Sequence, residues 1–396
     1  MSSAPVVFYH SRPRARADWR CPRSRYYAYD FDGGIQKDNL TLDLFLGTCL
    51  HDGIAAIATQ HRDLGKVDID KIGDSLRGLV FTTITDYAKE TTGSVSEDTR
   101  ILANEKATLV EGLIRGFYRV RWPQLIAQYP TILAIEAATI YPHDVNGHSV
   151  DLDNLPALIF IYNSRPDLVL QGDLGTIYIE VKSTGSKKAE WIESWQTDIQ
   201  VHATLRGIEF TLGEQPLGTI VQGLYKGSEY YGKFSSALVY GYVRRGNPPF
   251  TKSDYSAEYK YGMVKFPVWD YPGGSKAWIA QMSPEVLAEQ FPQTPLIFPN
   301  EELIEGFFRQ RAQREMTVRE AVEHLEQFSS NKQAILDVHF PQNFDACTPA
   351  WGHGCDFVKI CHGPAQNDPV GSGLYMVRDR SHEEEFDKLI RERLSL

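Results

Sequence analysis

The chain has 396 residues, a formal net charge of −10 and 12% aromatic residues. That composition is typical of a folded globular protein and excludes a disordered one, because disordered segments are poor in aromatic residues. The acidic balance argues against a protein coated by nucleic acid, but it is compatible with a local basic channel. We find no apolar run near the ~18 residues that a membrane span needs and no secretory leader, so we expect a cytoplasmic protein without membrane contact.

The N-terminal stretch, residues 10–30, is irregular, basic and aromatic. Pro22 directly follows Cys21 and can open a short helix. Six arginines lie close together in this stretch: Arg12, Arg14, Arg16, Arg20, Arg23 and Arg25. The opposite end of the chain is acidic, so the asymmetry would suit a polyanion bound near the N-terminal segment, with surface solubility as the alternative.

Apolar residues then recur at helical spacing over three long segments, which predicts a helical layer. These segments begin at Leu42, at about Asp70 and at about Asp98, and the third extends to Tyr129. From Thr131 the period changes to that of strands. We expect strands over 131–140, 155–161, 217–224 and 237–242, helices over 189–205 and 300–328, and a short final helix from about Glu383. Helices, a mixed sheet and a covering helix describe an α/β fold, which we interpret as one elaborated domain.

A predicted β-hairpin carries the residues that point most clearly to chemistry. Two runs rich in β-branched and aromatic residues are separated by Gly172-Asp-Leu-Gly175. Asp167 begins the first run, while Glu180 and Lys182 project from one face of the second. Two carboxylates and an ammonium that converge can hold a hard divalent cation and orient a water molecule beside it. Taken alone, Glu-x-Lys on an exposed strand is more often a solvated pair.

Three cysteines fall within fifteen residues of an irregular segment rich in Gly, Trp, His and Pro: Cys347, Cys355 and Cys361. Three thiolates lack one ligand for a tetrahedral centre or a four-iron cluster. Cys21 is the obvious fourth ligand, and Cys49 is the weaker candidate because it lies on the apolar face of a helix. His353 and His362 could also bind, in which case zinc becomes the natural ion.

Six motifs follow one another along the chain: Cys21-Pro-Arg-x-x-Tyr-Tyr, Gly47-x-x-x-His51, Arg165-Pro166-Asp167, Glu180-Val-Lys182, Gln200 in the next helix, and Cys355-x5-Cys361. In this order they resemble the RecB-like branch of the PD-(D/E)XK nucleases. The resemblance is to its iron–sulfur members in particular, the CRISPR-associated RecB-like exonucleases and the nuclease domain of AddB. Two departures stand out. Thr204 replaces the tyrosine of the family's Gln-x-x-x-Tyr helix, and seven residues separate Cys347 from Cys355.

The resemblance implies a restriction-endonuclease-like core, in which helices flank a mixed β-sheet. A nuclease core with its N-terminal helical layer would occupy residues 1–245, and an insertion or appendage would occupy 246–300. A C-terminal helix and cysteine segment, 301–396, would pack back on the N-terminus. The expected activity is metal-dependent hydrolysis of DNA, as an exonuclease on single strands or ends, in a prokaryotic or phage-encoded protein. A recombination, CRISPR or phage protein is the expected protein partner.

The resemblance also assigns roles to individual residues. His51, Asp167, Glu180 and the carbonyl of Val181 would hold Mg²⁺ or Mn²⁺. Lys182 would orient the attacking water or stabilise charge on the phosphate, and Gln200 would fix its helix against the site. Glu136, in the preceding strand, could assist the metal, with an exposed strand acid as the better interpretation.

Cys21, Cys347, Cys355 and Cys361 would hold a structural 4Fe-4S cluster, with Zn²⁺ as the alternative. Arg20, Arg23, Arg25 and Tyr27 would then line an entrance for DNA. The alternative function is a catalytically idle nucleic-acid-binding or assembly protein on a nuclease fold.

Overall fold

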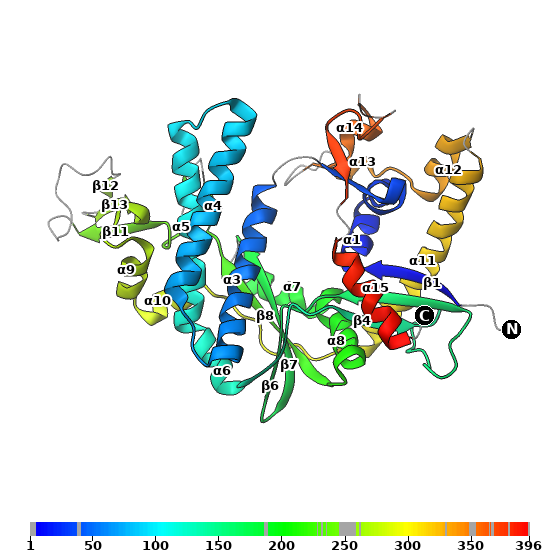
Figure 1. The fold of residues 1–396 in the computed structure, drawn as a ribbon, viewed down its shortest axis with the longest axis horizontal. Coiled ribbons are helices and arrows are strands. Elements are labelled where there is room, and N and C mark those ends of the chain that lie inside the picture. The colour runs from blue at the N-terminus through cyan, green and yellow to red at the C-terminus, as the bar shows by residue number, and fades with distance from the viewer. Residues whose placement is uncertain are drawn as a thin grey trace.

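The computed structural model has a mixed α/β fold with mixed sheets, which confirms the predicted class (Figure 1). The structure describes residues 5–37, 41–185, 189–227, 229–230, 233–234, 236–244, 259–260, 263–328, 331–347, 354–363, 365, 368–378 and 381–394. Figure 1 shows two groups of helices joined by strands: α3, α4 and α5 on one side, and α1, α11 and α12 on the other.

The predicted helical layer consists of α3 (Leu42–Leu64), α4 (Ile69–Thr92), α5 (Glu97–Val120) and α6 (Trp122–Gln128). The third expected helix is therefore two helices, because the chain breaks at Arg121 before a proline in the first turn of α6. By length and composition α3 could cross a membrane, which the sequence analysis did not expect. Its apolar residues, among them Leu46, Leu50 and Ile54, instead pack in the main core with α4 and α5, as in a soluble protein.

The central sheet has the strand order β3-β6-β7-β8, formed by β3 (Thr131–Ile135), β6 (Leu168–Gly172), β7 (Gly175–Thr184) and β8 (Pro216–Tyr225). The predicted hairpin is confirmed, since β6 and β7 pair antiparallel from Leu168–Ile179 to the turn. Strands β7 and β8 run parallel. On β7, Ile177, Ile179 and Val181 face the helical layer, while Tyr178 faces the opposite side, in keeping with the two-residue period of a strand.

A helical crossover covers that opposite side and consists of α7 (Ala189–Ser194), η3 (Trp195–Thr197) and α8 (Ile199–Leu212). The expected helix over 189–205 is interrupted because Asp198 caps α8, accepting a hydrogen bond from the Gln200 backbone N–H at 2.9 Å. Leu205 and Ile208 of α8 pack against Tyr178 of β7. The crossover thus brings the first turn of α8 to the face that carries Glu180 and Lys182.

A second sheet, in the order β1-β5-β4, contains β1 (Val6–Ser11), β5 (Leu158–Ser164) and β4 (Thr139–His143). Only a few residues separate β3 from β4, and likewise β5 from β6. The antiparallel pair β3–β6 of the first sheet therefore continues as the pair β4–β5 of the second. The pair bends where residues 136–138 lie opposite residues 165–167. The strand expected over 131–140 is therefore two strands. This bend is the structural basis of the candidate site.

The described part of 246–300 packs into the main core, whereas the sequence analysis expected an insertion or appendage. It follows β11 (Tyr240–Arg244) and includes β13 (Met263–Pro267), α9 (Gly274–Gln281) and α10 (Pro284–Ala288). Ile279, Leu287 and Phe291 lie in the same cluster as α5, and Thr219 of β8 exchanges backbone hydrogen bonds with Ile297. The rest of this expectation, 246–258 and 261–262, lies outside the described residues.

The two ends of the chain pack against each other. The N-terminal elements are α1 (Arg12–Arg20), α2 (Pro22–Arg25), η1 (Tyr26–Asp30), η2 (Phe31–Gly33) and β2 (Ile35–Lys37). The C-terminal elements are α11 (Glu301–Gln327), α12 (Lys332–His339), α13 (Phe344–Cys347), α14 (Val358–Cys361), β14 (Tyr375–Val377) and α15 (Ser381–Leu394). Strands β2 and β14 pair antiparallel, and Phe357 and Ile360 share a cluster with Tyr26 and Tyr27. Short elements elsewhere are β9 (Glu229–Tyr230), β10 (Lys233–Phe234), β12 (Tyr259–Lys260) and η4 (Val268–Asp270).

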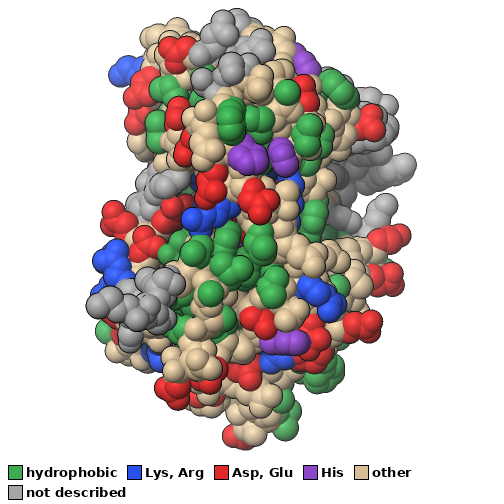
Figure 2. All heavy atoms as spheres, turned by 90° about the vertical axis from the view of Figure 1, so that its right-hand side faces the viewer, with side chains coloured by type: hydrophobic (Ala, Val, Ile, Leu, Met, Phe, Trp, Pro, Cys, Tyr) green, Lys and Arg blue, Asp and Glu red, His purple; other side chains and the backbone are tan. Residues whose placement is uncertain are grey.

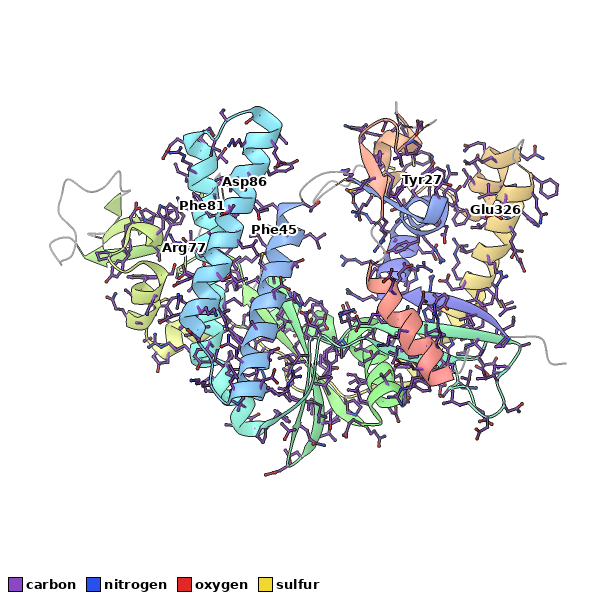
Figure 3. The ribbon with its side chains drawn as sticks, viewed as in Figure 1. Tyr27, Phe45, Arg77, Phe81, Asp86 and Glu326 are labelled. Atoms are coloured by element: carbon purple, nitrogen blue, oxygen red, sulfur yellow. The ribbon has the colours of Figure 1, made fainter. Side chains whose placement is uncertain are left out.

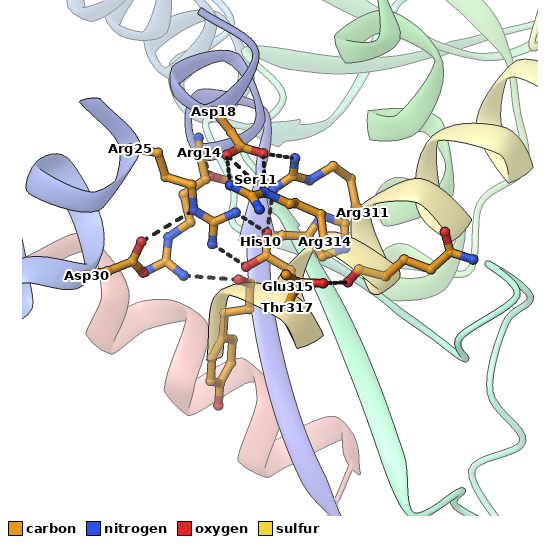
Figure 4. Close-up of polar contacts among 12 residues, drawn as sticks. His10, Ser11, Arg14, Asp18, Arg25, Asp30, Arg311, Arg314, Glu315 and Thr317 are labelled. Atoms are coloured by element: carbon orange, nitrogen blue, oxygen red, sulfur yellow. Dashed lines mark hydrogen bonds and ion pairs between the residues drawn. The ribbon is translucent and has the colours of Figure 1, made fainter. Parts of the chain in front are cut away.

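A buried ion network joins α1 and α2 to α11 (Figure 4). Glu315 receives hydrogen bonds from Arg25 Nη1 at 3.0 Å and from Arg311 Nη2 at 2.6 Å. Arg311 Nη1 also reaches Asp18 Oδ2 at 3.0 Å, and Arg314 contacts the same carboxylate. Arg25, Arg311 and Glu315 are at most 5% exposed, so each charge depends on its partners rather than on water.

Candidate active site

The bend between the two sheets places Glu136 beside Asp167. The Glu136 backbone N–H donates to the Asp167 carbonyl at 2.9 Å, which fixes the two residues across the bend. Glu136 has a φ of 43°, a left-handed conformation that is uncommon for a residue with a side chain and is found most often at functional sites. Arg165 donates to the Glu136 carbonyl at 2.8 Å and pairs with Glu385 of α15, so the bend is secured on both sides.

His51, from the middle of α3, completes a group of three ligand-type side chains. Its Nδ1 lies 2.8 Å from Asp167 Oδ1 and 4.0 Å from Glu136 Oε1. Ligand atoms of His51, Glu136 and Asp167 all lie within 4.8 Å of one another. Each of the three side chains remains partly exposed, so the group can be reached from solvent.

Strand β7 brings the remaining predicted residues to the same place. The Val181 backbone N–H donates to Asp167 Oδ2 at 2.6 Å, which orients the carboxylate toward β7. Glu180 Oε1 contacts both the Lys182 ammonium and the side-chain amide of Gln200, from the first turn of α8. Glu180 Oε2 is buried and has no hydrogen-bond partner within the described chain. A buried carboxylate oxygen without a partner is costly, and a cation would satisfy it.

The electrostatics of the site reflect crowded carboxylates. Burial raises the pKa of Glu180 to about 7, opposed by Lys182 and reinforced by the Asp167 carboxylate. Burial likewise raises the pKa of Glu136, with Asp167 again adding to the rise. Burial would lower the pKa of His51, but its hydrogen bond to Asp167 raises it above the ordinary value. Like charges held this close favour protonation or the binding of a cation.

Glu136 is the residue that the sequence analysis underrated. It was interpreted as an exposed strand acid, but it lies at the break between β3 and β4 and faces His51 and Asp167. Two alanines follow Glu136 in the sequence. Such small side chains fill little of a core, which was the one indication in the sequence that the buried strand ends here. Arg165, which the sequence analysis names only within a motif, holds the bend through Glu136 and Glu385.

The four predicted cluster cysteines come together where the two chain ends meet. Cys21 Sγ accepts from the Asn343 backbone N–H at 3.4 Å, and the Cys355 backbone N–H donates to the Cys347 carbonyl at 3.2 Å. Burial raises the pKa of the Cys361 thiol to about 12; Arg23 opposes this rise, whereas Cys355, Cys21 and Cys347 add to it. Such mutual influence requires the four thiols to be neighbours. Cys49, the weaker candidate, is buried in the main core, away from them.

The spacing of these thiols bears on the choice of cofactor. A tetrahedral zinc with Zn–S bonds of about 2.3 Å holds its sulfurs about 3.8 Å apart. In the described part of the chain, only His51, Glu136 and Asp167 place three ligand atoms within 4.8 Å of one another. His362 is exposed and its ring rests against Phe344, and His353 lies outside the described residues. Both a 4Fe-4S cluster and Zn²⁺ therefore stay predictions for these four cysteines.

The expectation that Arg23, Arg25 and Tyr27 contact DNA is wrong. Arg23 and Arg25 are 2% and 1% exposed. Arg23 Nε donates to the Phe340 carbonyl at 2.8 Å, and Arg25 pairs with Glu315. Tyr27 is buried and packs on Phe357 within the chain-end group, away from α3 (Figure 3). Both guanidinium groups are buried and already bonded within the protein, so they cannot also pair with phosphates of a bound DNA. Arg20 is exposed, and its predicted contact with DNA stays a prediction.

Surface charge on one face fits the acidic composition. Figure 2, which views the side of α11 and α12, shows acidic and basic side chains scattered over that face. The exposed pair of Arg319 and Glu323 on α11, at 2.8 Å, is an example. This face therefore offers a nucleic acid no uniformly basic surface.

No protein-family profile matches the chain, and no curated protein matches it.

Proposed function

We propose that this protein is a metal-dependent deoxyribonuclease with a restriction-endonuclease-like core. The observation that carries the proposal is the convergence, at one bend of the sheet, of His51, Asp167 and Glu136 with Glu180 and Lys182. Residues from α3, from the bend just before β6 and from β7 meet there although 116 sequence positions separate His51 from Asp167. A buried Glu180 with a raised pKa, beside a partly exposed Lys182, is typical of a catalytic site rather than of a solvated surface pair.

The donor set fits a hard divalent ion, either Mg²⁺ or Mn²⁺. Carboxylate oxygens from Asp167, Glu180 and Glu136 and one imidazole from His51 would hold it, and the imidazole makes Mn²⁺ suitable. The unpartnered Glu180 Oε2 supports this assignment, as does the excess of acidic groups over His51 and Lys182. A bound ion would supply a polarised phosphate and a water of lowered pKa. The carbonyl of Val181 stays a predicted ligand.

Lys182 is the side chain that can act directly on the reacting groups. Burial would lower the pKa of Lys182, but Glu180 and Asp167 raise it above the ordinary value, so the ammonium stays charged. A fixed positive charge beside the carboxylates can orient a water molecule and stabilise the negative charge that develops on a phosphate under attack. Gln200, bound to Glu180, holds the first turn of α8 and the carboxylate in register.

For the cysteines we propose a structural 4Fe-4S cluster held by Cys21, Cys347, Cys355 and Cys361. The position of the four thiols between the two chain ends supports this role. Cluster binding would then contribute directly to folding, because the unfolded chain offers no preformed site. A cluster at this position would join α2 to α14 at the periphery of the core, which fits a structural role better than electron transfer.

The test is cleavage of end-labelled single- and double-stranded DNA with Mg²⁺ or Mn²⁺, with anaerobically prepared protein. We expect cleavage that needs the metal and that Lys182→Ala abolishes. Lys226→Ala is the matched control, because Lys226 pairs with the exposed Asp43 at 3.1 Å and should leave cleavage unchanged. A folded protein that binds DNA without cleaving it would overturn the proposal in favour of an idle binding or assembly role.

A further inference from the structure

A cavity of about 810 Å³ lies between α1, the start of α8 and the first half of α11. The α1 wall contributes Arg12, Arg16 and Trp19. The opposite wall is formed by Asp198, Ile199, Asn300, Glu302, Leu303, Phe307 and Gln310, among others. A volume of this size is in the range of sites for small ligands and suits one or two nucleotides, whereas a duplex is too wide.

The cavity is next to the candidate active site. Arg12 pairs with Asp198 at 2.6 Å, and Asp198 caps the turn of α8 from which Gln200 reaches Glu180. The charge of Arg12 also acts on Lys182, although burial and Glu180 influence the pKa of Lys182 more. One turn of α8 thus separates the cavity from the catalytic side chains.

The α1 wall has the chemistry of a site for an unpaired nucleotide. Trp19 is 56% exposed, which is unusual for so large an apolar side chain. Its ring packs edge-on against Phe307, with the ring centroids 6.1 Å apart, and this contact holds the indole in place. Arg16 is exposed on the same helix, one turn away. An aromatic platform beside an arginine is the arrangement by which proteins hold single strands without reading their sequence.

The charged residues on the α1 and α11 walls would determine how an unpaired nucleotide lies in the cavity. Arg12 is already committed to Asp198, which leaves Arg16 as the cation for a backbone phosphate. The acidic Glu302 lies on the α11 wall, where it disfavours phosphate, while Gln310 offers its amide to a base edge. The phosphate is therefore expected along α1 and the base between Trp19 and α11.

We infer that this cavity, here called the α1–α11 cavity, binds an unpaired nucleotide of a single-stranded nucleic acid beside the scissile phosphate. The base stacks on Trp19 and a neighbouring phosphate pairs with Arg16. The inference rests on the proposed nuclease function for the identity of the ligand, but its test is a binding measurement that does not depend on cleavage. The sequence analysis placed the DNA entrance at Arg20, Arg23, Arg25 and Tyr27, and this cavity takes the place of the three buried residues of that set.

The experiment measures binding of a fluorescently labelled ten-nucleotide oligothymidylate by anisotropy, with divalent ions chelated so that no cleavage occurs. Trp19→Ala should weaken binding about tenfold or more, and Trp19→Phe should keep affinity near that of the wild type, because stacking needs only an aromatic face. Arg16→Ala should lower the salt dependence of binding by about 0.7 in log–log slope, the amount expected for one phosphate on a single strand. Arg100→Ala, an exposed arginine on α5, is the control and should change neither quantity.

The outcomes separate this inference from the proposed function. Binding by Trp19→Ala within twofold of the wild type overturns the inference, even if the protein cleaves DNA. Trp19-dependent binding by a protein that never cleaves with Mg²⁺ or Mn²⁺ supports the cavity and overturns the nuclease. In an active enzyme, Trp19→Ala should raise KM for single strands and leave kcat unchanged, since the platform touches no reacting atom.

Discussion

Replacing Glu315 by glutamine should be among the most destabilising single changes of a polar residue in this protein. Glu315 is 5% exposed and neutralises two arginines, Arg25 at 3.0 Å and Arg311 at 2.6 Å, which are themselves 1% and 2% exposed. Glutamine keeps the size of the side chain but removes its charge, so both guanidinium groups lose an ionic partner that water cannot replace. Breaking a buried pair from one side costs about 3–5 kcal/mol.

The same helix provides a matched control. Glu323 pairs with Arg319 at 2.8 Å, but these side chains are about half exposed, at 51% and 47%. An exposed pair contributes about 0.2–1 kcal/mol, so Glu323→Gln should have little effect. Equilibrium urea unfolding of the anaerobic protein measures both variants. With a slope of about 3 kcal/mol per molar urea, Glu315→Gln should lower the midpoint by about 1 M or more. A shift no larger than that of Glu323→Gln would refute the claim that buried charges join the chain ends.

Three further predictions concern other parts of the molecule. Burial lowers the pKa of His143 to about 4, and His10, 2.7 Å away, is also held neutral. The unfolded chain takes up a proton at His143 below about pH 6.5, whereas the folded protein does so only near pH 4. The free energy of unfolding should therefore fall by about 3 kcal/mol as the pH decreases from about 6.5 to 4. The urea midpoint of His143→Leu should depend less on pH over that window. Cys21→Ser should remove the brown colour and the iron that the proposed cluster would give the anaerobic protein, whereas Cys49→Ala should keep both. Glu136→Gln should weaken Mn²⁺ binding about tenfold or more by isothermal titration calorimetry, and unchanged affinity would exclude Glu136 from the metal site.

The sequence predicted regular elements well where local periodicity decides them. The three long apolar stripes and the hairpin around Gly172 and Gly175 correspond to α3 to α5 and to β6–β7. It failed where an element ends for reasons of tertiary structure. The break after β3 depends on the opposing residues 165–167, and the break before α8 depends on a cap at Asp198.

The site residues, too, could be predicted where local spacing determines them and could not where tertiary structure does. Asp167, Glu180 and Lys182 could be predicted because their spacing on two paired strands determines which way they project. Glu136 could not, because its contribution depends on a left-handed backbone that its residue type does not indicate. Arg25 was expected at the surface because arginine usually lies there, but its partner is 290 positions away in sequence, beyond the reach of local pattern.

The measurement that tests the central claim most directly is single-turnover cleavage of an end-labelled single strand over a titration of Mn²⁺, comparing the wild type with Asp167→Asn. Asp167 touches His51 and the Val181 backbone N–H and lies at the centre of the proposed metal site. The account predicts saturable, Mn²⁺-dependent cleavage by the wild type and a loss of about a hundredfold or more in rate at subsaturating metal for the variant. Cleavage by Asp167→Asn with the same rate and the same metal dependence as the wild type would contradict it.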